Sequence, residues 1–169
     1  MDFTYLLEKG LKNLSGAGAF LTAGDGRTQS APAGAGVNTM TISWGFVGFI
    51  WAKPHFITVV RPQRYTRTLL DAGDSFTISV PFDGTLKEEL AICGTQSGRD
   101  INKAEIVRFI PARSVASPIV AGCGLYYECL KKHAQPIDGE LLPKEIKGNF
   151  YNEDFHIMYC GEIVECYSL

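Results

Sequence analysis

The fold can be read from the stretch NTMTISWGFVGFIWAKPHFITVVRPQRYT, residues 38–66. Polar and apolar side chains alternate over residues 39–44, which is typical of a β-strand with one face toward a core. The nearly all-apolar run at residues 56–60 predicts a central strand that ends at Arg61 and Pro62, because proline cannot continue a hydrogen-bonded ladder. The stretch therefore predicts two strands followed by an arginine-rich corner that leads into a helix.

Helices are predicted on both sides of this stretch. Apolar residues at helical spacing predict an N-terminal helix at about residues 3–14. A hydroxyl near its start and a glycine at its end predict a short helix at residues 66–73. A capping box formed by Thr85 and Glu88 predicts a third helix that runs through Cys93.

The remaining segments read mostly as short strands. Residues 133–155, with two prolines and several aromatic residues, are expected to form a loop, as is the Gly-, Ala- and Pro-rich segment 24–36. Short alternating strands with brief turns favour a mainly-β fold, an antiparallel barrel with helices laid across it, over a βαβ sheet. The further strands are expected at residues 17–23, 75–80, 108–111, 125–132 and 156–168.

Composition excludes several classes of function. The chain has 169 residues and a net charge of −2, with no basic stripe of the kind that nucleic acids or membrane surfaces require. The longest apolar run, residues 45–52, is too short to cross a bilayer. The start MDFTYLLEKG does not have the form of a secretory signal, so we expect a cytoplasmic protein. From the charge distribution we expect that it binds neither nucleic acid nor a membrane.

Five cysteines are scattered without a C-x-x-C motif. An odd number without an export signal favours reduced, buried thiols over a disulfide framework. Cys123, Cys129 and His133 have an unconventional spacing for zinc, so we expect no metal site.

The corner RPQRYTR at residues 61–67 is the strongest chemical signal. Three arginines at a helix start are mildly unfavourable without an anion, because the helix dipole is positive there. Helix-start amides and planar guanidinium groups together suit a phosphate monoester. The corner therefore predicts a phosphate site, with a solvated basic loop as the alternative.

Two weaker candidates accompany this corner. The segment SGRD at residues 97–100, with Lys103, either closes over the same ligand or forms a turn. His156 opens the last strand, where a histidine is usually structural but can also move protons. The sequence has no G-x-S-x-G motif, P-loop or paired metal-binding carboxylates, which favours chemistry carried out by a cofactor.

Four segments of the chain resemble the flavin reductase-like, FMN-binding split-barrel family, nearest to its flavoredoxin-type branch. These are NTMTISW at 38–44, VRPQRYT at 60–66, CGTQSGRDINK at 93–103 and HIMYCGEIV at 156–164. The resemblance implies a single FMN-binding domain over residues 1–169, a Greek-key split β-barrel with flanking helices. It also implies a homodimer with FMN in a groove between the subunits.

The resemblance further assigns residues to FMN, with Thr41 and Ser43 as the main polar contacts of the ring. The isoalloxazine ring would lie against Asn38, Thr39, Met40, Thr41, Ile42, Ser43 and Trp44. The ribityl phosphate would be held by Arg61, Gln63, Arg64, Tyr65 and Thr66. The segment that covers the flavin would contribute Cys93, Ser97, Gly98, Arg99 and Lys103. His156 would stand beside the ring as the candidate catalytic residue.

These features lead us to expect an FMN-dependent, NAD(P)H:flavin-type oxidoreductase. Electrons would pass from NADH, NADPH or another donor through FMN to a flavin, a metal chelate or a protein acceptor. An FMN-binding electron-transfer protein without its own nicotinamide site is the first alternative, and a flavin-free interaction protein is the second. We expect Phe46, Phe49 and Trp51 to lie on the outer surface and to contribute to the dimer.

Overall fold

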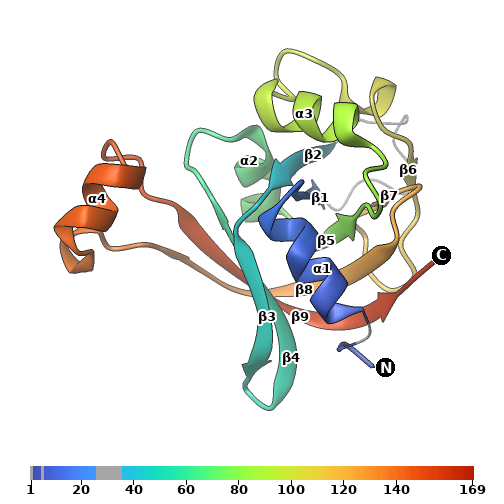
Figure 1. The fold of residues 1–169 in the computed structure, drawn as a ribbon, viewed down its shortest axis with the longest axis horizontal. Coiled ribbons are helices and arrows are strands. Elements are labelled where there is room, and N and C mark those ends of the chain that lie inside the picture. Colours follow the sequence, from blue (N-terminus) through green and yellow to red (C-terminus); the bar gives the residue numbers. More distant parts are fainter. Residues whose placement is uncertain (1, 5, 26–35) are drawn as a thin grey trace.

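The computed structural model describes residues 2–4, 6–25 and 36–169, so most of the predicted 24–36 loop lies outside the described part. The mainly-β fold with flanking helices is confirmed (Figure 1). Its main sheet is antiparallel, with the strand order β2 (Val37–Ile42), β1 (Ala19–Gly24), β5 (Ser75–Val80), β8 (Leu125–Pro136), β9 (Ile157–Tyr167), β4 (Lys53–Val60), β3 (Gly45–Ile50). A smaller sheet pairs β6 (Phe109–Ile110) with β7 (Ile119–Val120).

The helices flank this sheet and leave its strands as the core. They are α1 (Leu7–Ser15), α2 (Tyr65–Ala72), α3 (Lys87–Thr95) and α4 (Lys144–Phe150), with short 3-10 turns at Lys103–Glu105 and Gly139–Leu141. The observed N-terminal helix starts later than the expected residue 3. No helix in the described ranges is long and apolar enough to span a bilayer.

The two ends of the strand order are neighbours in the sequence. Strand β2 lies at one end and β3 at the other, yet only Ser43 and Trp44 separate them. The sheet must therefore curl until its edges nearly meet, and the Thr58 hydroxyl on β4 donates a hydrogen bond to the Trp44 carbonyl (3.3 Å). Because the edges do not pair, one side of β2 keeps backbone groups without a strand partner. The result is a barrel that is split along β2.

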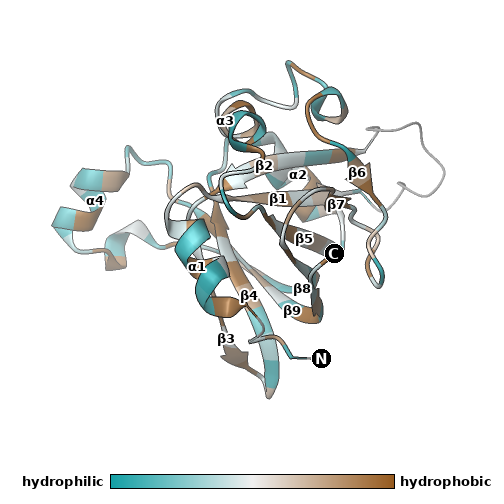
Figure 2. Cartoon of the chain, turned by 45° about the vertical axis from the view of Figure 1, so that its right-hand side comes forward, coloured by the Kyte–Doolittle hydropathy of each residue, from teal (hydrophilic) through white to brown (hydrophobic). Residues whose placement is uncertain are grey.

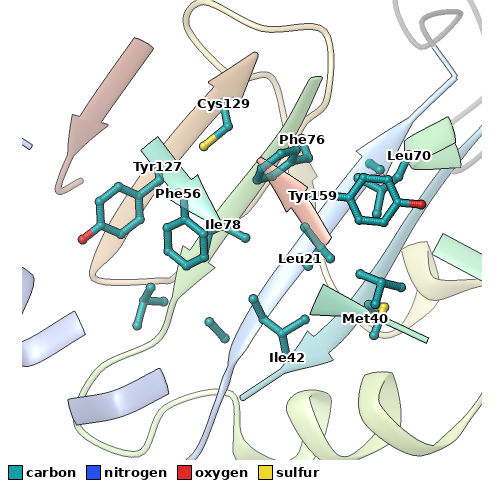
Figure 3. Packing of buried hydrophobic residues seen from close by; sticks show 14 of the residues in the cluster. Leu21, Met40, Ile42, Phe56, Leu70, Phe76, Ile78, Tyr127, Cys129 and Tyr159 are labelled. Carbon is teal, nitrogen blue, oxygen red and sulfur yellow. The ribbon is translucent and has the colours of Figure 1, made fainter. Parts of the chain in front are cut away.

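Both faces of strand β1 are buried. Phe20 and Leu21 are fully buried but belong to different hydrophobic clusters, because consecutive strand residues point to opposite faces. Leu21 lies in the barrel core, part of which is shown in Figure 3. Phe20 packs with Leu90 and Cys93 of α3. Helix α3 therefore lies against the sheet near β2, and each such buried side chain contributes roughly 1.5–3 kcal/mol.

The predicted capping box of α3 is wrong. The Thr85 hydroxyl donates to the Phe82 carbonyl (2.9 Å), and the helix starts at Lys87 without a side-chain cap. Leu86 adopts a left-handed conformation, with φ of 55°. A local turn therefore competes successfully with the capping box for the threonine hydroxyl.

The predicted loop at residues 133–155 is also wrong in part. Strands β8 and β9 pair from Tyr126 with Tyr167 to Pro136 with Ile157, so the ribbon continues beyond the barrel. It carries α4, which Figure 1 shows standing away from the barrel. Residues 133–137 are exposed or half-buried, so their strand lacks the apolar alternation that marks a core strand. We call residues 137–156 the arm.

Glu128 on β8 is fully buried and holds three separate groups. Its carboxylate accepts the backbone N–H groups of Arg113 and Ser114, both at 2.7 Å, and the Tyr167 hydroxyl at 2.6 Å. The Arg113 guanidinium lies over the Tyr167 ring, 3.6 Å from its centroid. One carboxylate thus ties the 113–114 turn and the end of β9 to the centre of the sheet.

Replacing Glu128 with alanine should lower the free energy of unfolding by about 3 kcal/mol, because the buried Tyr167 hydroxyl and two part-buried backbone N–H groups would lose their acceptor. Urea unfolding measures this change. The Glu165→Ala variant is the control: it removes the same charge from the cross-strand neighbour of Glu128 on β9, and should change stability by about 0.5 kcal/mol or less. Equal losses in the two variants would contradict this role.

Candidate functional site

Two hollows adjoin along strand β2. The first, which we call the Trp44 lobe, has a volume of about 340 Å³ and is lined by Met40, Thr41, Ile42, Ser43, Trp44, Val59, Arg61, Gln63, Arg64 and His156. The second, the Ser97 lobe, has a volume of about 190 Å³ and is lined by Asn38, Thr39, Met40, Gln63, Arg64, Tyr65, Thr66, Cys93, Thr95, Gln96, Ser97 and Gly98. Three residues, Met40, Gln63 and Arg64, line both lobes, so the two form one continuous site.

The structure brings together nearly all of the residues that the sequence singled out. Only Arg99 and Lys103, among the predicted site residues, line neither lobe. The four segments that carry them are far apart in the sequence, and the curl of the sheet places them around β2. Their contacts with a ligand stay a prediction, but their convergence is a property of the fold.

The β2 hydroxyls are less free than the sequence pattern indicated. Thr39 is fully buried, and its hydroxyl donates to the Leu21 carbonyl (3.2 Å) and accepts from the Thr22 hydroxyl (2.9 Å). The Thr41 hydroxyl donates to the Leu90 carbonyl of α3 (2.6 Å). Ser43, by contrast, is exposed at the Trp44 lobe. The predicted strand is confirmed, but the hydroxyls of Thr39 and Thr41 bond to backbone carbonyls of the protein itself.

Arg64 is the cation that both lobes share. Its guanidinium donates to the Gly94 carbonyl at the end of α3 (2.8 Å), and burial lowers the pKa of Arg64 below its ordinary value. A partly desolvated charge gains stability from a nearby anion. Arg64 is also the N-cap residue of α2, where no side-chain hydrogen bond caps the helix.

The Ser97–Arg99 turn closes one side of the Ser97 lobe. A Cβ on Gly98 would clash with the Asn38 side chain and lie 2.8 Å from the Tyr65 ring. The Arg99 guanidinium lies 5.1 Å from the centroid of Tyr65 and donates to the Gln63 carbonyl (3.1 Å). Only glycine permits this close approach of the turn to β2 and α2. Arg99 thus holds the turn in place from behind.

Lys103 does not line the site but supports the end of α3 next to it. Its ammonium group is buried and donates to the Ile92 carbonyl (3.2 Å) and the Gln96 carbonyl (2.6 Å). Burial is the main cause that lowers the pKa of Lys103, and the same effect raises the pKa of nearby Cys93. Lys103 therefore caps the C-terminal end of α3 and positions the segment that leads into Ser97.

Arg61 lies at the opposite end of the site from the Ser97 lobe. Its guanidinium forms an ion pair with Asp154 (2.5 Å) and donates to the Phe150 carbonyl (2.8 Å). Gln63 donates to the same Asp154 oxygen (3.1 Å). Arg61 thus lines the Trp44 lobe and receives a carboxylate from the arm, and its predicted contact with the ribityl phosphate stays a prediction.

His156 stands in an aromatic setting at the Trp44 lobe. Its Nδ1 shares a hydrogen bond with the Tyr151 hydroxyl (3.1 Å), and its ring centroid lies 5.0 Å from that of Trp44. Trp44 also meets Phe150 edge-on at 5.5 Å. Burial lowers the pKa of His156 to about 4, with the Arg61 charge as a second cause. The imidazole is therefore neutral near pH 7.

Sequence reasoning missed the part of the arm that completes the Trp44 lobe. Phe150, Tyr151 and Asp154 contact Trp44, His156 and Arg61, yet all three fell in the segment read as a loop. The aromatic residues around Phe155 were the available signal. They gave no indication of which strand they would meet, because their contacts depend on the long β8–β9 ribbon.

The site offers anion binding at one end and an aromatic surface at the other. The Ser97 lobe combines Arg64 with the uncapped start of α2, while the Trp44 lobe combines Trp44, neutral His156 and an Arg61 that is paired with Asp154. Within the described ranges, no group of three or more His, Cys, Asp or Glu residues is arranged to hold a metal ion. The geometry therefore suits an elongated ligand with an anionic end and a flat ring.

Comparison with known proteins identified a matching family profile and several similar structures. The sequence profile of a family described as "Flavin reductase like domain" matches residues 13–168. A search of curated proteins gave no match. The chain is similar in structure to flavoredoxin from Methanosarcina acetivorans, with a TM-score of 0.65 and 18% identity over 90% of this chain and 68% of that one.

Two further solved structures are similar. An FMN-binding protein from Thermus thermophilus has a TM-score of 0.66 and 20% identity over 89% of this chain and 69% of that one. The NADH:FAD oxidoreductase of Streptomyces globisporus C-1027 has a TM-score of 0.63 and 14% identity over 90% of this chain and 75% of that one. At such identities the likeness establishes a common fold.

We expect the ring protons of His156 to titrate with a midpoint near pH 4 rather than near 6.5. Because the unfolded chain would bind this proton at higher pH, folding stability should fall as the pH drops from about 6.5 toward about 4. Proton NMR measures the midpoint, and urea unfolding measures the stability. The His156→Asn variant should lose this part of the pH dependence. A midpoint close to 6.5 would show that the imidazole is solvated.

Proposed function

The chain belongs to the flavin reductase like domain family, and on this premise we propose that it is an FMN-dependent oxidoreductase. The observation that carries the proposal is the continuous site along β2, cationic in the Ser97 lobe and aromatic in the Trp44 lobe. FMN has the same division, since a phosphate ends its ribityl chain and a flat ring forms its other end. When bound, FMN supplies a ring that accepts and releases electron pairs.

The Ser97 lobe suits the phosphate. Arg64 offers a partly desolvated guanidinium, and the start of α2 offers amide donors without a side-chain cap. Ser97 adds a hydroxyl, and Gly98 lets the backbone of the turn come close. The Asn38 amide donates to the Thr66 hydroxyl (2.8 Å), which fixes both side chains at the floor of this lobe.

The Trp44 lobe suits the ring. The open edge of β2 presents alternating N–H and C=O groups, which can pair with the carbonyl oxygens and the N–H of a pyrimidine ring. Trp44 supplies an aromatic surface, and His156, which is neutral near pH 7, adds no charge beside the ring. These residues orient the ring and limit water on that side.

The reaction is the transfer of electrons from a donor to an acceptor through the bound flavin. A reduced nicotinamide is the proposed donor, and the proposed acceptor is a second flavin, a metal chelate or a protein. Anaerobic mixing of the FMN-loaded protein with NADH and with NADPH tests the donor. Rapid bleaching of the visible flavin band supports an enzyme with its own nicotinamide site, while absence of bleaching indicates an electron carrier.

The proposed assembly is a homodimer that uses the β3–β4 hairpin. Phe46, Phe49 and Trp51 are 51%, 65% and 62% exposed, as expected, and Figure 2 shows the hydrophobic colour of β3. Trp51 and Ala52 form the tip with φ of 51° and 57°, where turns of this type usually have asparagine or glycine. An apolar hairpin with a large indole in a strained turn supports a protein–protein contact.

Replacing Arg64 with methionine should weaken the affinity for FMN by about 100-fold, since a charge-assisted contact to phosphate contributes roughly 1.5–3 kcal/mol. The affinity for riboflavin, which lacks the phosphate, should change far less. Fluorescence quenching of each flavin measures the two dissociation constants. Equal losses for FMN and riboflavin would place the phosphate elsewhere.

The dimer can be tested by sedimentation at micromolar concentration. We expect a dimer for the natural chain and a monomer for Phe46→Glu, because a carboxylate would be buried in the apolar contact. Leu169→Glu alters another exposed apolar residue, 69% exposed at the C-terminus, and should stay dimeric. A monomeric natural chain would rule out the hairpin contact.

A further inference from the structure

We propose that Asp154 sets the reduction potential of the flavin bound in the Trp44 lobe, by neutralising the charge of Arg61. The inference rests on the proposed function, since it concerns a ring bound in that lobe. It adds a role for a carboxylate of the arm that the sequence pattern did not single out.

Arg61 belongs to the barrel, but its charge is offset by a carboxylate of the arm. Arg61 follows β4 and lines the Trp44 lobe, while Asp154 approaches from the arm and pairs with it at 2.5 Å. Gln63, also a lining residue, donates to the same carboxylate oxygen. The second guanidinium nitrogen is taken by the Phe150 carbonyl. The charge of Arg61, which lines the lobe, is therefore balanced by Asp154, which does not line it.

Asp154 keeps its negative charge throughout the working pH range. The Asn152 amide, Gln63 and Arg61 all donate to its carboxylate, and together they lower the pKa of Asp154 to about 2. The charge that Arg61 presents to the lobe is thus offset at any pH near neutrality. The offset can be removed by mutation.

The sign of the effect follows from electrostatics. A reduced flavin ring carries more negative charge than the oxidised ring, so a nearby positive charge favours reduction. Asp154 weakens this influence of Arg61 and should keep the potential low, which makes the reduced cofactor a stronger reductant. Among the other residues that line this lobe, Arg64 also carries a positive charge, while Trp44 and neutral His156 contribute no formal charge near pH 7.

The test uses the FMN-loaded full chain and four variants. Asp154→Asn keeps the shape and the acceptor oxygen but removes the charge, and Asp154→Glu keeps the charge. Glu153→Gln removes an equal charge from the neighbouring exposed residue. The readouts are the dissociation constants of oxidised and reduced FMN and the midpoint potential, each at low and at high salt. The fourth variant, Arg61→Gln, should shift the potential in the opposite direction from Asp154→Asn.

Asp154→Asn should increase the preference for reduced FMN about tenfold, which corresponds to a rise of about 30 mV for a two-electron couple. The rise should shrink in high salt, because the lobe is open to solvent and screening weakens charge effects. Asp154→Glu and Glu153→Gln should stay close to the natural chain.

Three results would overturn the inference. These are an unchanged potential in Asp154→Asn, an equal shift in Glu153→Gln, and an equal shift in Asp154→Glu, the last of which would show that the arm's position matters rather than its charge. Failure of the natural chain to bind FMN at all would instead refute the proposed function, and the inference with it.

Discussion

The unpaired edge of β2 is the constraint on which the rest of the structure depends. A seven-stranded sheet whose ends are joined by two residues must curl, yet β2 and β3 do not pair. The open edge of β2 therefore lines the two lobes of the site. Helices α2 and α3 flank it, and their ends bring Arg64 and Ser97 to the same strand. A ligand placed there meets backbone, helix termini and side chains at once.

Around this edge, the protein holds its own polar groups in place. Arg64 donates to the end of α3, Arg99 donates to the Gln63 carbonyl, and Lys103 caps α3 from within. Each of these contacts uses part of a cation's hydrogen-bonding capacity to fix its position. A site built in this way loses little side-chain entropy when a ligand binds, because the side chains are already ordered.

The strands of the barrel and the arginine-rich corner could be predicted from sequence because their signals are local. Alternation identified β2 and the Arg61–Pro62 step marked the end of β4, while the assignment of residues 38–44, 93–103 and 156 to one flavin site rested on the family resemblance. The two failures had different causes, the first local and the second non-local. Thr85 formed a turn instead of a cap, and Asp154 reaches Arg61 only because the β8–β9 ribbon extends beyond the barrel. Neither the ribbon's length nor its direction is encoded in a short pattern.

The arm is joined to the molecule in an unusual way, since α4 has no buried residue. The arm is fastened at the site by the last residue of α4, Phe150, and by Tyr151 and Asp154 in the segment that follows the helix. Substitutions or insertions in α4 would therefore leave the barrel core intact while changing what surrounds the mouth of the Trp44 lobe. Changes on the surface of α4 should therefore cost little folding stability.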